Sequence, residues 1–436
     1  MVDSATRMSS LTRVPIQQTL VVSHARSREE VDELLQRGGS LEGADQYEAL
    51  VMRRLTFHET TCDILRKSLQ NRYNKGRPWK KVELRNVEPS TATNAIATCM
   101  SVDAIEEIQF VMNNVEVNPK GWNSIGEGIR SNVKLRCLRI TSVLEGAGIK
   151  MLSRGLEGGS FLKILDLTWC TFASDDVILT LARGLRTNTN LAELHCMGCN
   201  MRDDQLAWLV GGLANHPTLE CLDINGNKAG AMASAAIARL LESNLPSLRK
   251  LDMSFQKGTQ RLQMPVLSRA LVASASISIL DLSNCRLEDD DAILLGQMLC
   301  QSSSTILELF IARNRITDEG IISLAAMLPH FTSLRRLSLW GNPFFDEGAR
   351  ALADGMAENY QILDLGLFRH FSSSDSIMMS TQLNRAGRRL LHVQDPVPLG
   401  LWALVFARIN KLSFAPVSTP DIMRHMLEDF MLCTKR

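Results

Sequence analysis

Residues 306–316 read I-L-E-L-F-I-A-R-N-R-I, and residues 334–344 read L-R-R-L-S-L-W-G-N-P-F. Both stretches fit one eleven-position template, L-x-x-L-x-L-x-x-[N/C]-x-L, in which L stands for any apolar residue. The template also starts at Trp79, Ile105, Leu135, Leu162, Leu191, Leu219, Leu248, Ile277 and Ile362. The match is looser at Trp79 and Ile362. From Leu162 on, successive starts are 28 or 29 residues apart. A repeat of this period decides the fold ahead of local propensity, because each unit must bury its apolar face against its neighbours.

Each repeat is predicted to contain one strand and one helix. The alternation of apolar and polar residues at template positions 3 to 7 is typical of a short strand. After Asn314 the apolar residues follow helical spacing, at Ile321, Leu324, Ala325 and Leu328. Thr317 or Asp318 can cap that helix. Strand–helix units stacked side by side predict an α/β fold, a right-handed curved solenoid with a parallel concave β-sheet, convex α-helices and helical caps at both ends.

The segments outside the template suggest the domain organisation. Residues 1–42 are polar and mixed in charge, so we expect a mostly flexible segment. Residues 43–78 carry helical apolar spacing and are predicted to form a helical N-terminal cap. Residues 79–367 hold about 11 repeats. Residues 368–436 are predicted to form a C-terminal cap, because the ends of a solenoid would otherwise expose its core.

Composition restricts the class of protein. The 436 residues carry a formal net charge of +1, so no bulk attraction to nucleic acid or to an anionic membrane is expected. No apolar run reaches the length of a membrane-spanning helix, and the first residues lack the apolar core of a signal peptide. Several of the ten cysteines stand at template positions and are expected to be reduced thiols. We therefore expect a cytoplasmic monomer, with the nucleus as an alternative location, that binds neither membrane nor nucleic acid.

The repeat resembles the ribonuclease-inhibitor-like class of leucine-rich repeat proteins in its period, its long helix and its Asn or Cys at template position 9. This position is filled here by Asn113, Cys170, Cys199, Asn227, Gln256, Cys285, Asn314 and Asn342, whereas the Leu135 repeat has Val143. The class includes ribonuclease inhibitor, the Ran GTPase-activating protein and the repeat arrays of NOD-like receptors. The resemblance covers about residues 79–367 and implies an array that binds proteins on its concave face.

Motifs that could carry catalysis or bind a metal have a structural interpretation. Cys196-Met197-Gly198-Cys199 is a C-x-x-C, but both cysteines stand at inward template positions and no second C-x-x-C supplies further ligands. Acidic pairs recur at the helix starts, where capping predicts them. They are Asp175-Asp176, Asp203-Asp204, Glu288 to Asp291, Asp318-Glu319 and Asp346-Glu347. Phosphate-binding and nucleophile-elbow motifs are not found. We therefore expect no enzyme, no cofactor and no metal.

Two sets of outward-facing residues are candidates for contact with a protein partner. The first is a row with His195 between its carboxylates, formed by Asp166, Asp223, Asp252 and Asp281. The row is interpreted first as solvated surface and alternatively as an acidic stripe for a basic partner. The second set consists of Phe310, Arg313, Arg335, Arg336 and Trp340, with Trp169 and Phe255 near earlier strand ends. Exposed Trp and Arg dominate binding hot spots, although the C-terminal cap could cover this set.

The function predicted from these residues is that of a non-enzymatic protein-binding scaffold or recognition module, which uses the concave face. The resemblance leaves two alternatives: a GTPase-activating protein of the Ran activator kind, and a NOD-like-receptor-type sensor or regulatory protein. Both alternatives rest on the class of fold, whereas the scaffold hypothesis also rests on the outward aromatic, Arg and Asp residues.

Overall fold

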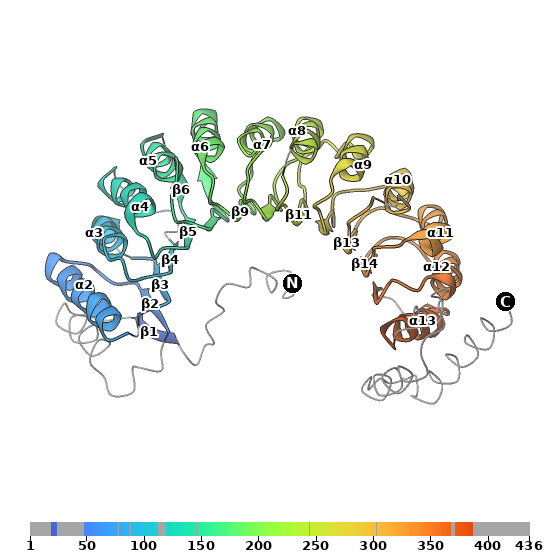
Figure 1. Ribbon diagram of the computed structural model, residues 1–436, viewed down its shortest axis with the longest axis horizontal. Coiled ribbons are helices and arrows are strands. Elements are labelled where there is room, and N and C mark those ends of the chain that lie inside the picture. Colours follow the sequence, from blue (N-terminus) through green and yellow to red (C-terminus); the bar gives the residue numbers. More distant parts are fainter. Residues whose placement is uncertain are drawn as a thin grey trace. The chain divides into compact units, whose positions relative to one another are not determined.

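The computed structural model describes residues 19–23, 48–76, 78–87, 89–111, 119–144, 146–243, 245–301, 303–367 and 371–386. They belong to two compact units. Unit 1 consists of the chain up to Asn227 together with Ser243–Ser247, and unit 2 consists of Lys228–Glu242 and the chain from Leu248 on. In each unit, strands and helices alternate along the chain, and the helices lie on one side of the strands (Figure 1).

The main sheet of unit 1 has the order β1-β2-β3-β4-β5-β7-β9-β10, and each neighbouring pair is parallel. Its strands are β1 Thr19–Ser23, β2 Ala49–Arg53, β3 Lys81–Arg85, β4 Glu107–Val111, β5 Cys137–Thr141, β7 Ile164–Asp166, β9 Glu193–His195 and β10 Cys221–Asp223. The helices are α2 Glu59–Asn74, α3 Pro89–Met100, α4 Pro119–Ser131, α5 Gly146–Leu156, α6 Asp175–Thr187 and α7 Asp203–Gly211. A separate parallel pair joins β6 (Val143–Leu144) to β8 (Thr171–Phe172).

The sheet of unit 2 has the order β11-β12-β13-β14-β15, again with parallel neighbours. Its strands are β11 Lys250–Asp252, β12 Ile279–Asp281, β13 Glu308–Phe310, β14 Arg336–Ser338 and β15 Asp364–Gly366. The helices are α8 Ala231–Glu242, α9 Met264–Ala273, α10 Asp289–Leu299, α11 Asp318–Met327, the 3-10 turn η4 Leu328–His330, α12 Asp346–Glu358 and α13 Ser374–Ala386. The predicted α/β leucine-rich repeat solenoid is thus confirmed.

The apolar template positions form the core. In the β9 repeat, Leu191, Leu194 and Cys196 are fully buried, and the corresponding residues of the other complete repeats are buried in the same way. Burial of one such aliphatic side chain stabilises the fold by roughly 1.5–3 kcal/mol. Ordering the backbone costs about 1–2 kcal/mol per residue, so one repeat is not stable alone and needs the apolar surface of its neighbours.

Side chains at template position 9 form hydrogen bonds that join neighbouring repeats. Asn314 Nδ2 donates to the Leu282 carbonyl of the preceding repeat at 3.0 Å and to the Ile311 carbonyl at 2.9 Å, and its Oδ1 accepts the Cys285 N–H at 2.8 Å. A cysteine replaces part of this network, because Cys199 Sγ donates to the Leu167 carbonyl at 3.1 Å. The predicted inward role of this position is therefore confirmed. Asn113 lies outside the described residues, and Val143 lies in β6.

The N-terminal region differs from its predicted form. Residues 49–53 form strand β2, which pairs in parallel with β3, where the sequence predicted part of a helical cap over 43–78. The first four residues of β2 are buried, and a short apolar run of this kind fits a fully buried strand as well as a helix. Strand β1 lies within the segment expected to be mostly flexible. The predicted helix does form as α2, and the limits of both caps stay predictions.

The acidic residues at the helix starts bind backbone as predicted, but mostly that of the next repeat. Asp289 Oδ1, in the first turn of α10, accepts the Thr317 N–H at 2.7 Å. Asp318 Oδ1, in the first turn of α11, accepts the Phe345 and Gly348 N–H groups at 2.9 and 2.7 Å. Thr317 itself makes no side-chain cap bond, so its predicted capping role is wrong. The first turn of each helix lies beside the start of the next helix, where the carboxylate of a short side chain can accept hydrogen bonds from the free N–H groups.

Candidate binding surface

Template positions 3 and 5 point away from the helices, and we call the surface that they form the strand face. In unit 1 the register aligns Asp166 with His195 and His195 with Asp223. In unit 2 it aligns Asp252 with Asp281 and Asp281 with Phe310. The strands therefore bring the predicted site residues of each unit onto adjacent strands, as the repeat predicts.

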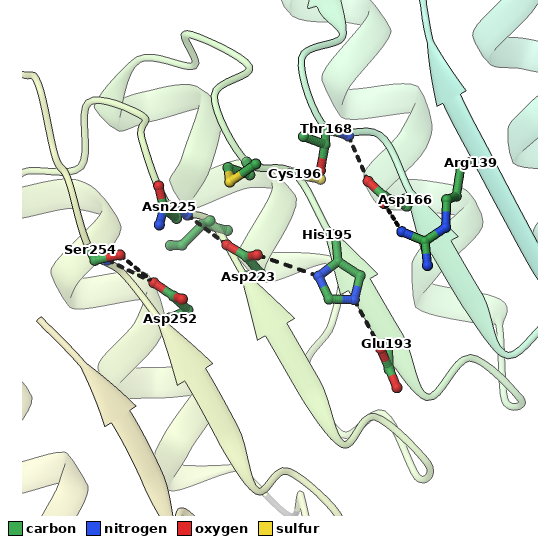
Figure 2. Close-up of polar contacts among 12 residues, drawn as sticks. Arg139, Asp166, Thr168, Glu193, His195, Cys196, Asp223, Asn225, Asp252 and Ser254 are labelled. Atoms are coloured by element: carbon green, nitrogen blue, oxygen red, sulfur yellow. Dashed lines mark hydrogen bonds and ion pairs between the residues drawn. The ribbon is translucent and has the colours of Figure 1, made fainter. Parts of the chain in front are cut away.

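The charges on the strand face of unit 1 satisfy one another. Arg139 donates to Glu107 Oε1 at 3.2 Å and to Asp166 Oδ2 at 2.9 Å, on the two strands that flank its own. His195 donates from Nε2 to Glu193 Oε2 at 3.0 Å and from Nδ1 to Asp223 Oδ2 at 3.4 Å (Figure 2). Each cation is thus held between two carboxylates.

Burial changes the interpretation of these residues. Asp166, His195 and Asp223 are only 4–5% exposed, so the expectation of a solvated row is wrong in unit 1. Burial lowers the pKa of His195, but its hydrogen bonds with Asp223 and Glu193 outweigh this effect and raise the pKa to about 9. The imidazole is therefore charged at neutral pH and forms an internal ion pair with both carboxylates.

The Asp residues at position 5 also share a local structural role. In each case one carboxylate oxygen accepts the backbone N–H two residues further on, at the end of the strand. These distances are 2.9 Å for Asp166, 3.0 Å for Asp223, 3.1 Å for Asp252 and 2.9 Å for Asp281. Three of these contacts are drawn in Figure 2. The recurring D-x-[T/N/S] sequence was a signal for this turn that the sequence interpretation missed.

The C-x-x-C motif lies in the core. Cys196 is fully buried and Cys199 is nearly so. Burial raises the pKa of both thiols well above the usual range. Thiols held in this form are poor metal ligands, since a metal binds the thiolate. In the part of the chain that the structure describes, no group of three or more His, Cys, Asp or Glu side chains could hold a metal ion.

Two of the predicted unit 2 residues form contacts within the sheet. Arg336 on β14 donates to Glu308 Oε2 on β13 at 3.0 Å and to Asp364 Oδ2 on β15 at 3.1 Å. Arg335 Nη1 donates to the Gln361 carbonyl at 3.3 Å. These bonds join neighbouring repeats, so both guanidinium groups have structural partners that the sequence interpretation did not foresee.

Arg313 and Trp340 have a different arrangement. Arg313 is exposed, and its guanidinium carbon lies 4.3 Å from the centre of the Trp340 ring, in cation–π geometry. Its backbone N–H donates to the Trp340 carbonyl at 2.7 Å. Phe310, at position 5 of the Arg313 repeat, is half-buried. The structure thus brings Arg313 and Trp340 together at the ends of β13 and β14.

Template position 8 has a left-handed backbone in every repeat from the one that starts at Leu162 to the one that starts at Leu334. The φ angles are +62° at Trp169, +67° at Gly198, +72° at Gly226, +56° at Phe255, +56° at Asn284, +53° at Arg313 and +77° at Gly341. Gly and Asn tolerate this conformation, but Trp, Phe and Arg do not favour it. The recurrence of Gly and Asn at this position was the available signal in the sequence.

A pocket in unit 2 adjoins Trp340. Its lining consists of Trp340, Gly341, Asn342, Pro343, Phe344, Leu367 and Phe371. The rings of Phe344 and Phe371 are stacked, with centroids 5.2 Å apart and planes 18° apart. Phe345, the next residue along the chain, is 60% exposed. The wall of the pocket thus includes three aromatic rings, those of Trp340, Phe344 and Phe371.

Comparison with known proteins agrees with this architecture. A family described as "Leucine Rich repeat" matches residues 302–325. "NACHT, LRR and PYD domains-containing protein 5" of Bos taurus is 26% identical over 154 residues, which are 35% of this chain and 14% of that protein. "Ribonuclease inhibitor" of Sus scrofa is 29% identical over 268 residues, which cover 54% of this chain and 58% of the inhibitor. Both matches cover less than two thirds of the relative.

Among solved structures, the actin-binding site 2 of leiomodin-1 aligns with a TM-score of 0.33 and 18% identity, over 36% of this chain and 92% of that one. The repeat template, the parallel strand–helix units and the sequence relatives agree with one another. The chain is built from leucine-rich repeats and is similar to proteins of the ribonuclease-inhibitor-like class.

Proposed function

We propose that this chain is a non-enzymatic module that binds a protein partner through the outward residues of its repeats. The inward residues at template positions 1, 4 and 6 determine the fold. The outward residues can vary without disturbing that core, which suits a repeat array to recognition. A binding surface is then identified by side chains that the fold does not need.

The left-handed backbone at position 8 is the observation that carries this proposal. This conformation costs an ordinary side chain roughly 1–2 kcal/mol, whereas Gly adopts it readily. Three repeats nevertheless have a large side chain there, namely Trp169, Phe255 and Arg313. Trp169 is 59% exposed, so core packing does not account for it. Trp and Arg are also the residues that dominate interface energetics, which supports a role in recognition.

In unit 2 we define the recognition surface as Phe310, Arg313, Trp340 and the adjoining pocket. Trp340 offers a large aromatic ring, and Arg313 offers exposed charge beside it. Arg335 and Arg336 are assigned a structural role instead, because they form hydrogen bonds with residues of neighbouring repeats. A basic partner for the Asp row stays a prediction, and the internal bonds of that row weaken it.

The relatives support the class of function without identifying the partner. The name of one relative states that it is an inhibitor of ribonuclease, and such inhibition requires binding to another protein. The other relative contains the same kind of repeat within a much longer chain. The Ran-type GTPase activator and the receptor-type sensor have no specific residue in this chain to favour them, so the protein-binding module is preferred.

The proposal is tested by affinity purification with the tagged full-length chain, followed by mass spectrometry. Trp340→Ala is expected to reduce the recovery of at least one partner about fivefold or more, because truncation of a hot spot costs at least about 1 kcal/mol. Arg350→Ala is the matched control, because this exposed arginine lies on helix α12 and outside the recognition surface. A partner profile that Trp340→Ala leaves unchanged contradicts the proposal.

A further inference from the structure

We infer that the pocket beside Trp340 binds a large apolar side chain of a protein partner, and that Arg313 binds a carboxylate on an adjacent residue of that partner. The inference rests on the proposed function and adds the chemistry of the bound segment. It therefore predicts an acidic segment with an apolar anchor, and not a basic one.

The apolar half of this inference comes from the pocket wall. Trp340, Pro343, Phe344, Leu367 and Phe371 present rings and aliphatic groups to the pocket. The stacked pair of Phe344 and Phe371 gives one side of the wall a flat aromatic face. An aromatic or large aliphatic side chain would gain burial on such a wall, at about 25 cal/mol per Å² of apolar surface removed from water.

The acidic half comes from the position of Arg313 against that wall. Its guanidinium lies over the Trp340 ring, and its Cγ would lie 2.9 Å from a Cβ placed on Gly341, so it packs against two lining residues. The left-handed backbone of Arg313 and its N–H bond to the Trp340 carbonyl fix where the side chain starts. Stacking on a ring leaves the edges of a guanidinium free to donate hydrogen bonds.

The surrounding charges leave a carboxylate as the fitting ligand. Glu308 on β13 and Asp364 on β15 are both bound by Arg336, and Asp281 on β12 accepts the Ser283 N–H at 2.9 Å. Within the described residues, Arg313 forms no ion pair. A carboxylate brought by a partner would form a charge-assisted, bidentate pair with Arg313, strengthened as the partner excludes water. A partner lysine or arginine at the same place would meet a like charge.

The test is a selection of random peptides displayed on phage against the immobilised full-length chain. Enriched peptides are expected to carry Phe, Trp, Leu or Met within about two residues of Asp or Glu, since the pocket and the guanidinium adjoin. The affinity of one such synthetic peptide is then measured by fluorescence polarisation. Arg313→Gln and replacement of the peptide acid by its amide should each weaken binding about tenfold, and both together little more than either alone. Arg350→Gln should change nothing.

The outcomes separate this inference from the function on which it rests. Enriched peptides that are basic, or whose binding Arg313→Gln leaves unchanged, overturn the acidic assignment. If these peptides still lose affinity with Trp340→Ala, the recognition surface itself is supported. If Trp340→Ala weakens the binding of none of the enriched peptides, the proposed placement of the recognition surface is overturned as well.

One alternative occupant is the chain's own C-terminal segment, which includes Leu427, Glu428, Asp429 and Phe430. The double variant Glu428→Gln with Asp429→Asn in the full-length chain tests it. Unchanged affinity for the selected peptide supports a separate partner. An affinity raised about tenfold shows that this segment competes for the site, and overturns the assignment of the pocket to a separate protein.

Discussion

The two units satisfy their outward-facing charges in different ways. In unit 1, Arg139 and His195 each lie between two carboxylates, and the His195 group is almost wholly buried. In unit 2, Arg336 is held in the same manner, but Arg313 lies exposed on Trp340. An outward template position is therefore not by itself a binding position. We therefore propose that the charges of unit 1 stabilise the fold, whereas Arg313 is available to a partner.

Removing the central cation of the unit 1 network should have the largest effect. Arg139→Ala removes the arginine that pairs with Asp166, which is 6% exposed at its side chain, and leaves Glu107, which is 4% exposed, paired with Lys81 at 3.0 Å. Such a loss costs about 3–5 kcal/mol. Urea unfolding should show this decrease in the free energy of unfolding. A decrease below about 1 kcal/mol would mean that the ion pairs of unit 1 contribute no more to the free energy of unfolding than exposed ion pairs do.

The protonation of His195 should make stability depend on pH. The folded pKa is about 9, above the unfolded value of about 6.5. The stabilisation is therefore fully present below about pH 6.5 and is lost as the pH rises through 9, with a size of up to about 3 kcal/mol. The measurement is the difference in unfolding free energy between the wild type and His195→Gln from pH 6 to pH 10. A difference that does not change over this range would contradict an internal ion pair.

The corresponding substitution in unit 2 should have a smaller effect. Arg336 is 29% exposed at its side chain, and its partners Glu308 and Asp364 are 27% and 45% exposed. Water can replace its bonds, so Arg336→Ala should cost about 1 kcal/mol or less. Peptide or partner affinity should stay within about twofold of the wild type. A loss of affinity as large as that caused by Trp340→Ala would mean that Arg336 belongs to the recognition surface.

The fold could be predicted from the sequence because the residues that determine it recur at a regular interval. The inward Leu residues and the Asn or Cys at position 9 recur in register, so each repeat supports the assignment of the next. Strand β2 was missed because its apolar run of four residues is too short for its periodicity to distinguish a strand from a helix.

The site was harder to predict, because its contacts join repeats about 28 residues apart. Glu308, Arg336 and Asp364 occupy the same template position in successive repeats, and aligning the repeats would have revealed their ion pairs. The sequence held no such signal for the burial of His195. The Arg313–Trp340 contact depends on a backbone angle that the identity of Arg313 does not suggest.

The central claim is that Arg313 serves binding rather than folding, and Arg313→Gly tests it most directly. Gly suits the left-handed backbone, and the exposed Arg side chain contributes little burial. The free energy of unfolding should stay the same or rise by up to about 1 kcal/mol, while affinity for the protein partner or selected acidic peptide falls about tenfold. A variant that loses stability by more than about 1 kcal/mol and keeps its affinity would contradict the account.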